Sequence, residues 1–252
     1  MNLNEGLLVY MINSGYTDWF YPLFILFILI TIAAAYLLGS INSAIIISKI
    51  FYNDDIRRHG SGNAGLTNML RTYGAFPAVM TLIGDILKTV IAIFIAAFFF
   101  GFWHTGGVST GDGFCYIAAL FAVLGHVFPI YYKFKGGKGV LTLATAALML
   151  SPIPFLILFF IFVIIVLITK YVSLASVTSV VLYPVVMSTY FKIVFTGLGM
   201  PGIASLSLII LAILIVWCHR ENLKRISERK ENKLSFGKKK KADTVNDENG
   251  KN

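Results

Sequence analysis

Charged residues are scarce in this sequence. Asp, Glu, Lys and Arg make up 13% of the 252 residues and hydrophobic residues make up 57%, whereas soluble domains carry roughly 25% charged residues. A chain with so few charges does not suit a water-facing globule. The unbroken apolar run from Tyr21 to Leu38 reaches the roughly 18 residues that mark a membrane-spanning helix. The composition therefore predicts an integral membrane protein.

Cysteine and early basic residues are also lacking. The two cysteines, Cys115 and Cys218, fall within or at the edge of apolar runs, where cysteine behaves as a small buried hydrophobe, so no disulfide framework is implied. The stretch from Met1 to Phe20 contains no Lys or Arg and lacks the basic start of a cleaved signal peptide. The first apolar helix is therefore expected to stay as an anchor.

Hydropathy and loop breakers predict an all-α, polytopic protein with seven transmembrane helices. The fourth helix is too short to cross a hydrocarbon core of roughly 30 Å upright, and Pro152 and Pro154 follow it at once. This helix is expected to form a tight hairpin with the fifth. The predicted helices are Phe20 to Ile50, Ala75 to Phe100, Phe114 to Tyr132, Gly139 to Leu150, Ile153 to Thr169, Val172 to Phe195 and Ile203 to Cys218.

Basic residues predict the orientation in the membrane. Lys and Arg follow the first, third, fifth and seventh predicted helices, whereas Gly101 to Gly113 has none and Lys192 stands alone. Since basic residues concentrate in cytoplasmic loops, the N-terminus is expected outside and the C-terminus inside. Residues 1–19 are then an extracytoplasmic extension, residues 20–225 the membrane domain and residues 226–252 a basic cytoplasmic tail that is expected to be disordered.

The tail carries much of the net charge of +9, including four consecutive lysines at Lys238 to Lys241. Such a run is typical of a solvated segment attracted to anionic lipid. Nucleic-acid binding is disfavoured because no aromatic residues alternate with the charges. Everything from Ser235 onward is expected to be disordered.

The glycine-rich segment Gly60 to Arg71 lies on the predicted inner side. Its sequence, GSGNAGLTNMLR, contains three glycines that can bring backbone N–H groups close to a ligand, and Ser, Thr and Asn side chains add donors. A loop of this kind that enters a helix can cradle phosphate. The alternative interpretation is a flexible connector rich in turn-forming residues.

A second glycine-rich segment, Lys135 to Thr142, places Lys138 among three glycines just before a predicted helix. It is not a P-loop, because the G-x-x-x-x-G-K-[ST] spacing is absent. The lysine and the N–H groups of the loop could still hold a phosphoryl group. The alternative is an ordinary lysine of a cytoplasmic loop.

A third polar segment, His219 to Arg225, follows the last predicted helix. On a continuing helix, His219 and Asn222 would lie on one face at positions i and i+3 and form a hydrogen-bonding pair at the membrane surface. The alternative is a helix-end histidine that interacts with the helix dipole. The stretch Val172 to Ser176 is a weaker signal, since serine in membrane helices commonly serves packing.

Two ionisable residues, Asp85 and Lys88, lie inside the second predicted span at positions i and i+3. Charged groups inside a membrane are costly enough to be functional candidates by default. An internal ion pair explains them equally well. The four polar segments, by contrast, all reach the same predicted side, which suggests one site for an anion.

Taken together, the motifs resemble the bacterial acyl-phosphate:glycerol-3-phosphate acyltransferase family. The resemblance is colinear and runs from about Ala35 to Arg225. The matching stretches are Ala35 to Ile41, Gly60 to Arg71, Gly125 to Pro129, Gly136 to Thr142, Tyr171 to Ser176 and His219 to Asn222. Asn42, Leu66 and Leu141 depart from the family's usual residues.

The resemblance implies a seven-helix enzyme of the bacterial plasma membrane with its site on the cytoplasmic side. It would transfer a fatty acyl group from acyl phosphate to the 1-hydroxyl of sn-glycerol 3-phosphate, giving lysophosphatidic acid and phosphate, the first acylation of phospholipid synthesis. No metal, other cofactor or acyl-CoA is implied. The expected partners are the two substrates and membrane lipid, with the acyl-phosphate-producing enzyme as a candidate partner protein and no nucleic acid.

By motif, the resemblance also assigns site residues. Ser61 and Arg71 would handle phosphate, Lys138 would be the lysine of the glycine loop, and His219 and Asn222 would complete the catalytic set. Glu221 would be structural. The further residues expected to bind substrate are Asn63, Thr67, Asn68, Gly136, Gly137, Gly139, Thr142 and Ser176.

The chemistry of an acyl phosphate agrees with this inventory. An acyl phosphate is an activated mixed anhydride whose phosphate leaves without a strong general acid. Ser61, Arg71 and Lys138 can hold two phosphates and stabilise developing charge, while Asn222 or His219 orients the attacking hydroxyl. The group that accepts the hydroxyl proton is left open, and the donor phosphate is one candidate.

Three other functions agree less well with this sequence. The H-x-x-x-x-D pair of CoA-dependent glycerolipid acyltransferases is missing after each of the four histidines, which disfavours that class. A membrane transporter of an organic phosphate would use similar basic groups, but transporters often show inverted repeats and this sequence shows no internal repeat. A non-catalytic lipid-binding scaffold would leave four convergent polar segments without a purpose.

Overall fold

The structure, a computed structural model, describes residues 6–16, 20–101, 110–194 and 200–234. Within these ranges every regular element is helical, which confirms the all-α prediction. The predicted disorder from Ser235 onward falls outside the described residues. The helices are α1 (Gly6–Asn13), α2 (Phe20–Ser40), α3 (Ser43–Tyr52), η2 (Ile56–Arg58), α4 (Leu66–Thr72), α5 (Ala75–Phe100), α6 (Thr110–Val127), η3 (Ile130–Tyr132), α7 (Val140–Leu150), α8 (Pro152–Thr169), α9 (Val172–Val194), α10 (Gly202–Cys218) and α11 (Arg220–Ser227).

Five helical stretches within the described ranges are long and apolar enough to cross a membrane. A sixth is added if α10 and α11, which are bent by 52° at His219, form one span. The seven predicted spans are therefore not confirmed as a count. The shortfall lies mainly at α7, whose 11 residues extend only about 16 Å at 1.5 Å per residue. As expected, α7 turns directly into α8 at Ser151.

The first predicted helix is not continuous, which corrects the prediction of one helix from Phe20 to Ile50. Helix α2 ends at Ser40 and α3 begins at Ser43. Between them, Asn42 accepts a hydrogen bond from the Ile45 N–H at 3.1 Å, as an N-cap residue does. The Asn42 amide also donates to the Ala64 carbonyl at 3.3 Å. The break therefore ties the start of α3 to the glycine-rich loop before α4.

Helix α6 is the buried centre of the bundle and contacts α2, α5, α7 and α10. Glycines permit its close approach to α2, because a Cβ atom on Gly125 would collide with the Tyr36 carbonyl and one on Gly39 would collide with the Ala122 backbone. Small residues at helix contacts are the usual packing device of membrane bundles. Large apolar side chains such as Phe94 and Ile168 are exposed on the outer helices, as a lipid-facing surface requires.

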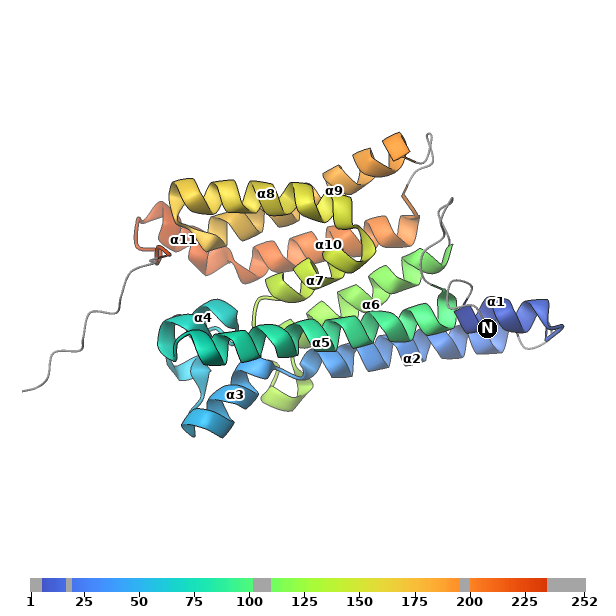
Figure 1. Cartoon of the computed structure of the whole chain (residues 1–252), viewed down its shortest axis with the longest axis horizontal. Coiled ribbons are helices and arrows are strands. Elements are labelled where there is room, and N and C mark those ends of the chain that lie inside the picture. Colours follow the sequence, from blue (N-terminus) through green and yellow to red (C-terminus); the bar gives the residue numbers. More distant parts are fainter. Residues whose placement is uncertain (1–5, 17–19, 102–109, 195–199, 235–252) are drawn as a thin grey trace, which may run out of the picture.

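The N-terminal extension contains a helix that the sequence analysis did not predict. Helix α1 packs against α5 and α2, and Leu8 is buried with Phe27, Phe100 and Phe114. Figure 1 shows α1 at one end of the bundle and α3, α4 and α11 at the opposite end. The polar segments singled out in the sequence therefore lie at one end of the helices, away from α1.

Candidate active site

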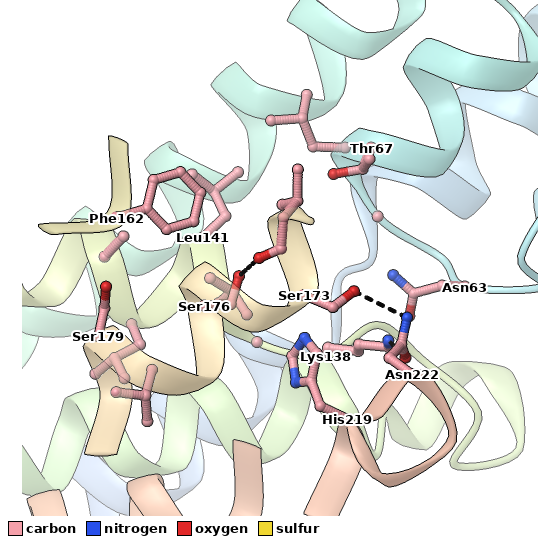
Figure 2. A pocket seen from close by; sticks show the side chains of 18 of the residues that line it. Asn63, Thr67, Lys138, Leu141, Phe162, Ser173, Ser176, Ser179, His219 and Asn222 are labelled. Atoms are coloured by element: carbon pink, nitrogen blue, oxygen red, sulfur yellow. Dashed lines mark hydrogen bonds between the residues drawn. The ribbon is translucent and has the colours of Figure 1, made fainter. Parts of the chain in front are cut away.

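A cavity of about 480 Å³ opens at the end of the bundle that carries α4 and α11. Figure 2 shows Lys138, His219 and Asn222 gathered at one end of this cavity, while Phe162 and Ser179 lie at the other. Two groups of residues at opposite ends of the lining matter for the argument. The first, named the polar end, consists of Ser61, Asn63, Thr67, Arg71, Lys138, His219 and Asn222. The second, named the apolar arm, consists of Leu141, Leu143, Ala144, Ala147, Phe155, Leu158, Phe159, Phe162 and Val180.

The loop from η2 to α4 is held in shape by Asn68, which is buried in the first turn of α4. Its amide nitrogen donates to the carbonyls of Ile56, His59 and Asn63 at 3.2, 2.9 and 3.1 Å, and its oxygen accepts from the Ser61 N–H at 3.0 Å. With both ends of its amide occupied, Asn68 stabilises the loop. Asn68 also lies on the cavity lining, so its contact with substrate stays a prediction.

The same loop was expected to offer its backbone N–H groups to phosphate, and the structure corrects this in part. The Ser61 N–H is taken by Asn68, the Gly62 N–H donates to the His59 carbonyl, and the Gly65 N–H donates to the Asn63 carbonyl. The loop therefore presents side chains to the cavity. Those on the lining are Ser61, Asn63, Thr67 and Arg71, with Ser61 and Arg71 exposed.

The second glycine-rich loop, which carries Lys138, is also held in place by internal hydrogen bonds. The N–H groups of Gly136 and Gly137 donate to the carbonyls of Val127 and His126, each at 3.1 Å. These two glycines do not line the cavity, and their contact with substrate stays a prediction. Gly139 does line it, at the N-cap of α7 with a positive φ of 76°, a conformation that favours glycine.

Thr142 also departs from its expected role. It is fully buried in the first turn of α7 and does not line the cavity. Its hydroxyl oxygen has no hydrogen-bond partner among the described residues. Ser176 does line the cavity and is buried, and its hydroxyl donates to the Val172 carbonyl at 2.9 Å.

A buried network adjoins the cavity, and two of its members, Asp85 and His126, line it. The network contains an ion pair between Asp85 and Lys88, one of the two interpretations that the sequence left open. The Lys88 ammonium contacts an Asp85 oxygen, the Ile41 carbonyl and Nδ1 of His126, each at 2.8 Å. Three acceptors satisfy its three N–H groups. His126 carries the carbonyl that holds Gly137, and a Cβ atom on Gly137 would collide with the imidazole. Through His126, the network therefore contacts Gly137 and helps to fix the loop that carries Lys138.

The bend at His219 brings its side chain and Asn222 to the cavity. The prediction that His219 and Asn222 lie on one face of a continuing helix is wrong, because the helix is interrupted at His219. His219 Nδ1 lies 2.8 Å from the Ile215 carbonyl. Because a carbonyl only accepts, Nδ1 carries the proton and Nε2 is the acceptor nitrogen of a neutral imidazole.

Asn222 is buried and joins three elements. Its oxygen accepts a hydrogen bond from the Lys138 ammonium, and its nitrogen donates to Ser173 Oγ at 3.0 Å and to a Glu231 oxygen at 2.6 Å. Arg225 also lines the cavity and pairs with Glu231 at 2.8 Å. The sequence analysis did not assign roles to Ser173, Arg225 or Glu231, because nothing in their spacing distinguishes them from surface residues.

Glu221, by contrast, is exposed and lies outside the lining. Its ion pair with Arg220, at 3.9 Å, leaves 66% of its side chain exposed. These contacts give no support to a structural role. The carboxylate that does hold the polar end together is Glu231.

The charge state of Lys138 is set by its surroundings. Burial lowers the pKa of its ammonium to about 8, and the Glu231 carboxylate opposes this by raising it. The ammonium is still mostly protonated at neutral pH. The polar end thus offers two cationic side chains, Lys138 and Arg71, beside hydroxyl and amide donors, which is a suitable set for phosphate.

All five residues expected to be catalytic therefore line one cavity: Ser61, Arg71, Lys138, His219 and Asn222. Of the eight residues expected to bind substrate, the structure places Asn63, Thr67, Asn68, Gly139 and Ser176 on the same lining. The described part of the chain is all-helical, with several membrane-spanning candidates, and its cavity joins cationic and polar groups to an apolar arm.

The comparison with known proteins identifies the family. The sequence model of the family described as "Glycerol-3-phosphate acyltransferase" matches residues 29–229. A glycerol-3-phosphate acyltransferase of Streptococcus thermophilus is 37% identical over 210 residues, 83% of this chain and 94% of the relative. One from Coxiella burnetii is 40% identical over 208 residues, 82% and 98% of the two chains. The chain belongs to the glycerol-3-phosphate acyltransferase family.

Two solved structures agree with this assignment. The crystal structure of PlsY (YgiH), an integral membrane glycerol 3-phosphate acyltransferase, in its glycerol 3-phosphate form has a TM-score of 0.70 and 33% identity, covering 82% of this chain and 96% of that one. Its lysophosphatidic acid form has a TM-score of 0.67 and 32% identity, covering 82% and 95%. This chain is accordingly an integral membrane acyltransferase, and the resemblance seen in its motifs is confirmed.

Proposed function

We propose that this protein transfers a fatty acyl group from acyl phosphate to the 1-hydroxyl of sn-glycerol 3-phosphate and releases lysophosphatidic acid and phosphate. Membership in the family supports glycerol 3-phosphate as the acceptor. The two solved structures of one relative, PlsY (YgiH), agree in name, since one is its glycerol 3-phosphate form and the other its lysophosphatidic acid form. The choice of acyl phosphate as the donor and of the 1-hydroxyl as the acceptor group is our proposal.

The observation that carries the proposal is the division of the cavity into a polar end and an apolar arm. A phosphate needs charged and polar donors, which Arg71, Lys138 and Ser61 supply. A fatty acyl chain needs an apolar surface, which α7, α8 and α9 supply in the apolar arm. Acyl phosphate carries both groups on one carbonyl carbon, so the carbonyl would lie where the two parts of the cavity meet.

The polar end suggests how the reaction would proceed. The 1-hydroxyl oxygen attacks the acyl carbonyl carbon, an ester bond forms, and the bond from that carbon to the phosphate oxygen breaks. Over the whole reaction the hydroxyl proton ends on the released phosphate. Lys138 and Arg71 would stabilise the negative charge of the two phosphates during the transfer. The acceptor nitrogen of His219 and the amide of Asn222 would orient the hydroxyl.

The donor is tested by supplying purified protein with glycerol 3-phosphate and either acyl phosphate or acyl-CoA. We expect lysophosphatidic acid from acyl phosphate alone, with unchanged rates after EDTA treatment. Equal use of acyl-CoA, or loss of activity in EDTA, would contradict the proposed chemistry. Protein reconstituted in vesicles that moves glycerol 3-phosphate without acylating it would instead favour an organic-phosphate transporter.

The role of the apolar arm is tested at Ala144, which lines the cavity on α7. Replacing Ala144 by Phe fills part of the arm, so we expect long acyl phosphates to lose activity while short ones keep it. Leu148→Phe is the matched control, because Leu148 is an exposed residue of the same helix outside the lining. A uniform loss over all chain lengths, or equal behaviour of the two variants, would speak against this use of the arm.

We further propose that the polar end faces the cytoplasm and that the protein lies in the plasma membrane. The basic residues Lys49, Arg57 and Lys135 near α3, η2 and η3 support this orientation. In a background without Cys115 and Cys218, single cysteines at Arg57 and Asp112 can be probed with an impermeant thiol reagent on intact cells. We expect labelling at position 112 and protection at position 57, and the reverse pattern would overturn the orientation.

A further inference from the structure

The apolar arm has a far end, which lies at the hairpin between α7 and α8. The lining reaches Ala147 on α7 and Tyr183 on α9, and on α8 it comes no nearer to the hairpin than Phe155. Ser151 joins α7 to α8 at the tip of this hairpin. Figure 2 shows Ser176 and then Ser179 along α9, leading away from the polar end. All three helices of the arm therefore stop lining the cavity near the hairpin.

Tyr183 is tied to the hairpin by a hydrogen bond. Its hydroxyl lies 2.7 Å from Ser151 Oγ, and the Ser151 hydroxyl donates to the Ala147 carbonyl at 3.1 Å. Because a serine hydroxyl has a single proton, the Tyr183 hydroxyl is the donor to Ser151. The polar group of this buried tyrosine is thereby paired, and its ring lies where α9 passes the hairpin.

Packed side chains close the arm at Tyr183. Tyr183 and Leu158 are 3% and 6% exposed and belong to the same apolar core cluster. Ser179 Oγ donates to the Leu158 carbonyl at 3.3 Å, which joins α8 to α9 beside the arm. The lining residue Phe159, by contrast, is 47% exposed. The surroundings therefore reach the arm along its side but not at its far end.

The length of the arm can be expressed in carbon atoms. Along α9 the lining runs from Val172 to Tyr183, 11 positions apart in the sequence, a rise of about 17 Å at 1.5 Å per residue. An extended alkyl chain advances about 1.25 Å per carbon, from C–C bonds of about 1.5 Å at an angle of about 111°. A chain of about 13 carbons thus spans the arm. A longer chain must fold back or press against the tyrosine ring.

We propose that Tyr183 is a specificity-determining residue of the acyl transfer, whose ring limits the length of the acyl chain that the arm holds. The inference rests on the proposed function, because it concerns the acyl chain of that reaction. It adds the residue that sets the limit. Forcing extra methylenes into a packed site is unfavourable, so acyl phosphates longer than about 14 carbons should be poorer substrates by at least about fivefold.

The dependence of kcat/KM on chain length tests this role. Acyl phosphates of about 8 to 20 carbons bracket the reach of the arm, and lipid vesicles supply them all from a bilayer. In the wild type we expect a decline of at least about fivefold beyond about 14 carbons. Tyr183→Ala removes the ring and should extend the accepted range to the longest chains. Ala147→Leu fills the far end from α7 and should shorten the range.

Two control variants separate the ring from other effects. Tyr183→Phe keeps the ring and should keep the wild-type length limit. Tyr190→Ala removes a tyrosine two turns further along α9, outside the lining, and should also keep it. Because loss of a buried ring lowers stability, Ala147→Leu provides an independent test in the opposite direction. Equal profiles in the wild type, Tyr183→Ala and Ala147→Leu, or a wild-type profile without a decline, would overturn the role of Tyr183.

A binding measurement without turnover distinguishes this inference from the proposed reaction. Lysophosphatidic acids of about 12 and 18 carbons lie on either side of the limit, and native mass spectrometry gives the ratio of their affinities. We expect the ratio of long to short to be at least about fivefold higher in Tyr183→Ala than in the wild type and Tyr190→Ala. Equal ratios in the three proteins would overturn the role of Tyr183. A wild type that is inactive with acyl phosphate but shows the expected ratios would overturn only the reaction.

Discussion

Replacing Arg71 by Ala should cost the enzyme most of its phosphate recognition while leaving its fold intact. Arg71 lies in the last turn of α4, is exposed, and lines the cavity. Its loss opens no hole in a packed core, so stability should change by no more than about 0.5 kcal/mol, as for most surface substitutions. The guanidinium can form two charge-assisted hydrogen bonds to one phosphate. Removal of the guanidinium is therefore expected to weaken the binding of phosphate groups and to leave the stability of the protein nearly unchanged.

The size of the effect follows from those bonds. Each charge-assisted hydrogen bond contributes about 1.5–3 kcal/mol, and about 1.4 kcal/mol corresponds to a factor of ten. Loss of one bond should thus lower kcat/KM for glycerol 3-phosphate at least tenfold. Arg71→Lys should recover part of it, since lysine keeps the charge but not the planar fork. Lys224→Ala, an exposed residue of α11 outside the lining, is the control. Equal kinetics in Arg71→Ala and Lys224→Ala would refute the site assignment.

Three further outcomes are expected. Asn222→Ala should lower kcat more than it raises KM, because the amide would act on the hydroxyl in the transition state; a change in KM alone would contradict this role. The pKa of Lys138 is lowered to about 8, and in the proposed reaction its protonated form holds phosphate. The value of kcat/KM should therefore be level below about pH 7 and decline above pH 8. Lys138→Arg, which stays protonated, should remove that decline. Lys88→Met leaves Asp85 as an unpaired buried charge, so the free energy of unfolding should fall by about 3–5 kcal/mol, with partial recovery when Asp85→Asn is added.

Long apolar helices were predictable because the bilayer leaves few alternatives. Helix α5 begins and ends where the sequence predicted, at Ala75 and Phe100, since a glycine precedes it and another follows it. The break near Asn42 was missed because the mostly polar stretch from Ser40 to Ser43 is short and apolar residues lie on both sides of it. Asn42 caps α3 through the Ile45 N–H and also donates to the Ala64 carbonyl, 22 residues away in the sequence.

The polar end was predictable as a set of side chains but not as a set of bonds. Basic and glycine-rich segments on one predicted side were enough to bring Ser61, Lys138 and His219 into one cavity. Which N–H groups remain available depends on pairings such as Gly137 with His126, which no local pattern reveals. Glu231 was missed for the same reason, because its partners come from α9 and α11 and its own surroundings in the sequence are those of a charged tail.

An apolar arm that holds the acyl chain, as we propose, implies that the two substrates reach the site from different phases. Moving a chain of about fifteen methylenes from hydrocarbon into water costs about 12 kcal/mol at roughly 0.8 kcal/mol per CH₂, an unfavourable partition of about nine powers of ten. A chain that passes from the bilayer into the arm between α7, α8 and α9 exchanges one apolar surrounding for another and avoids that cost. Glycerol 3-phosphate, by contrast, is a solute of the aqueous phase. In the proposed reaction, the two reactants would then meet at the junction of the polar end and the apolar arm, one arriving from the bilayer and the other from the aqueous phase.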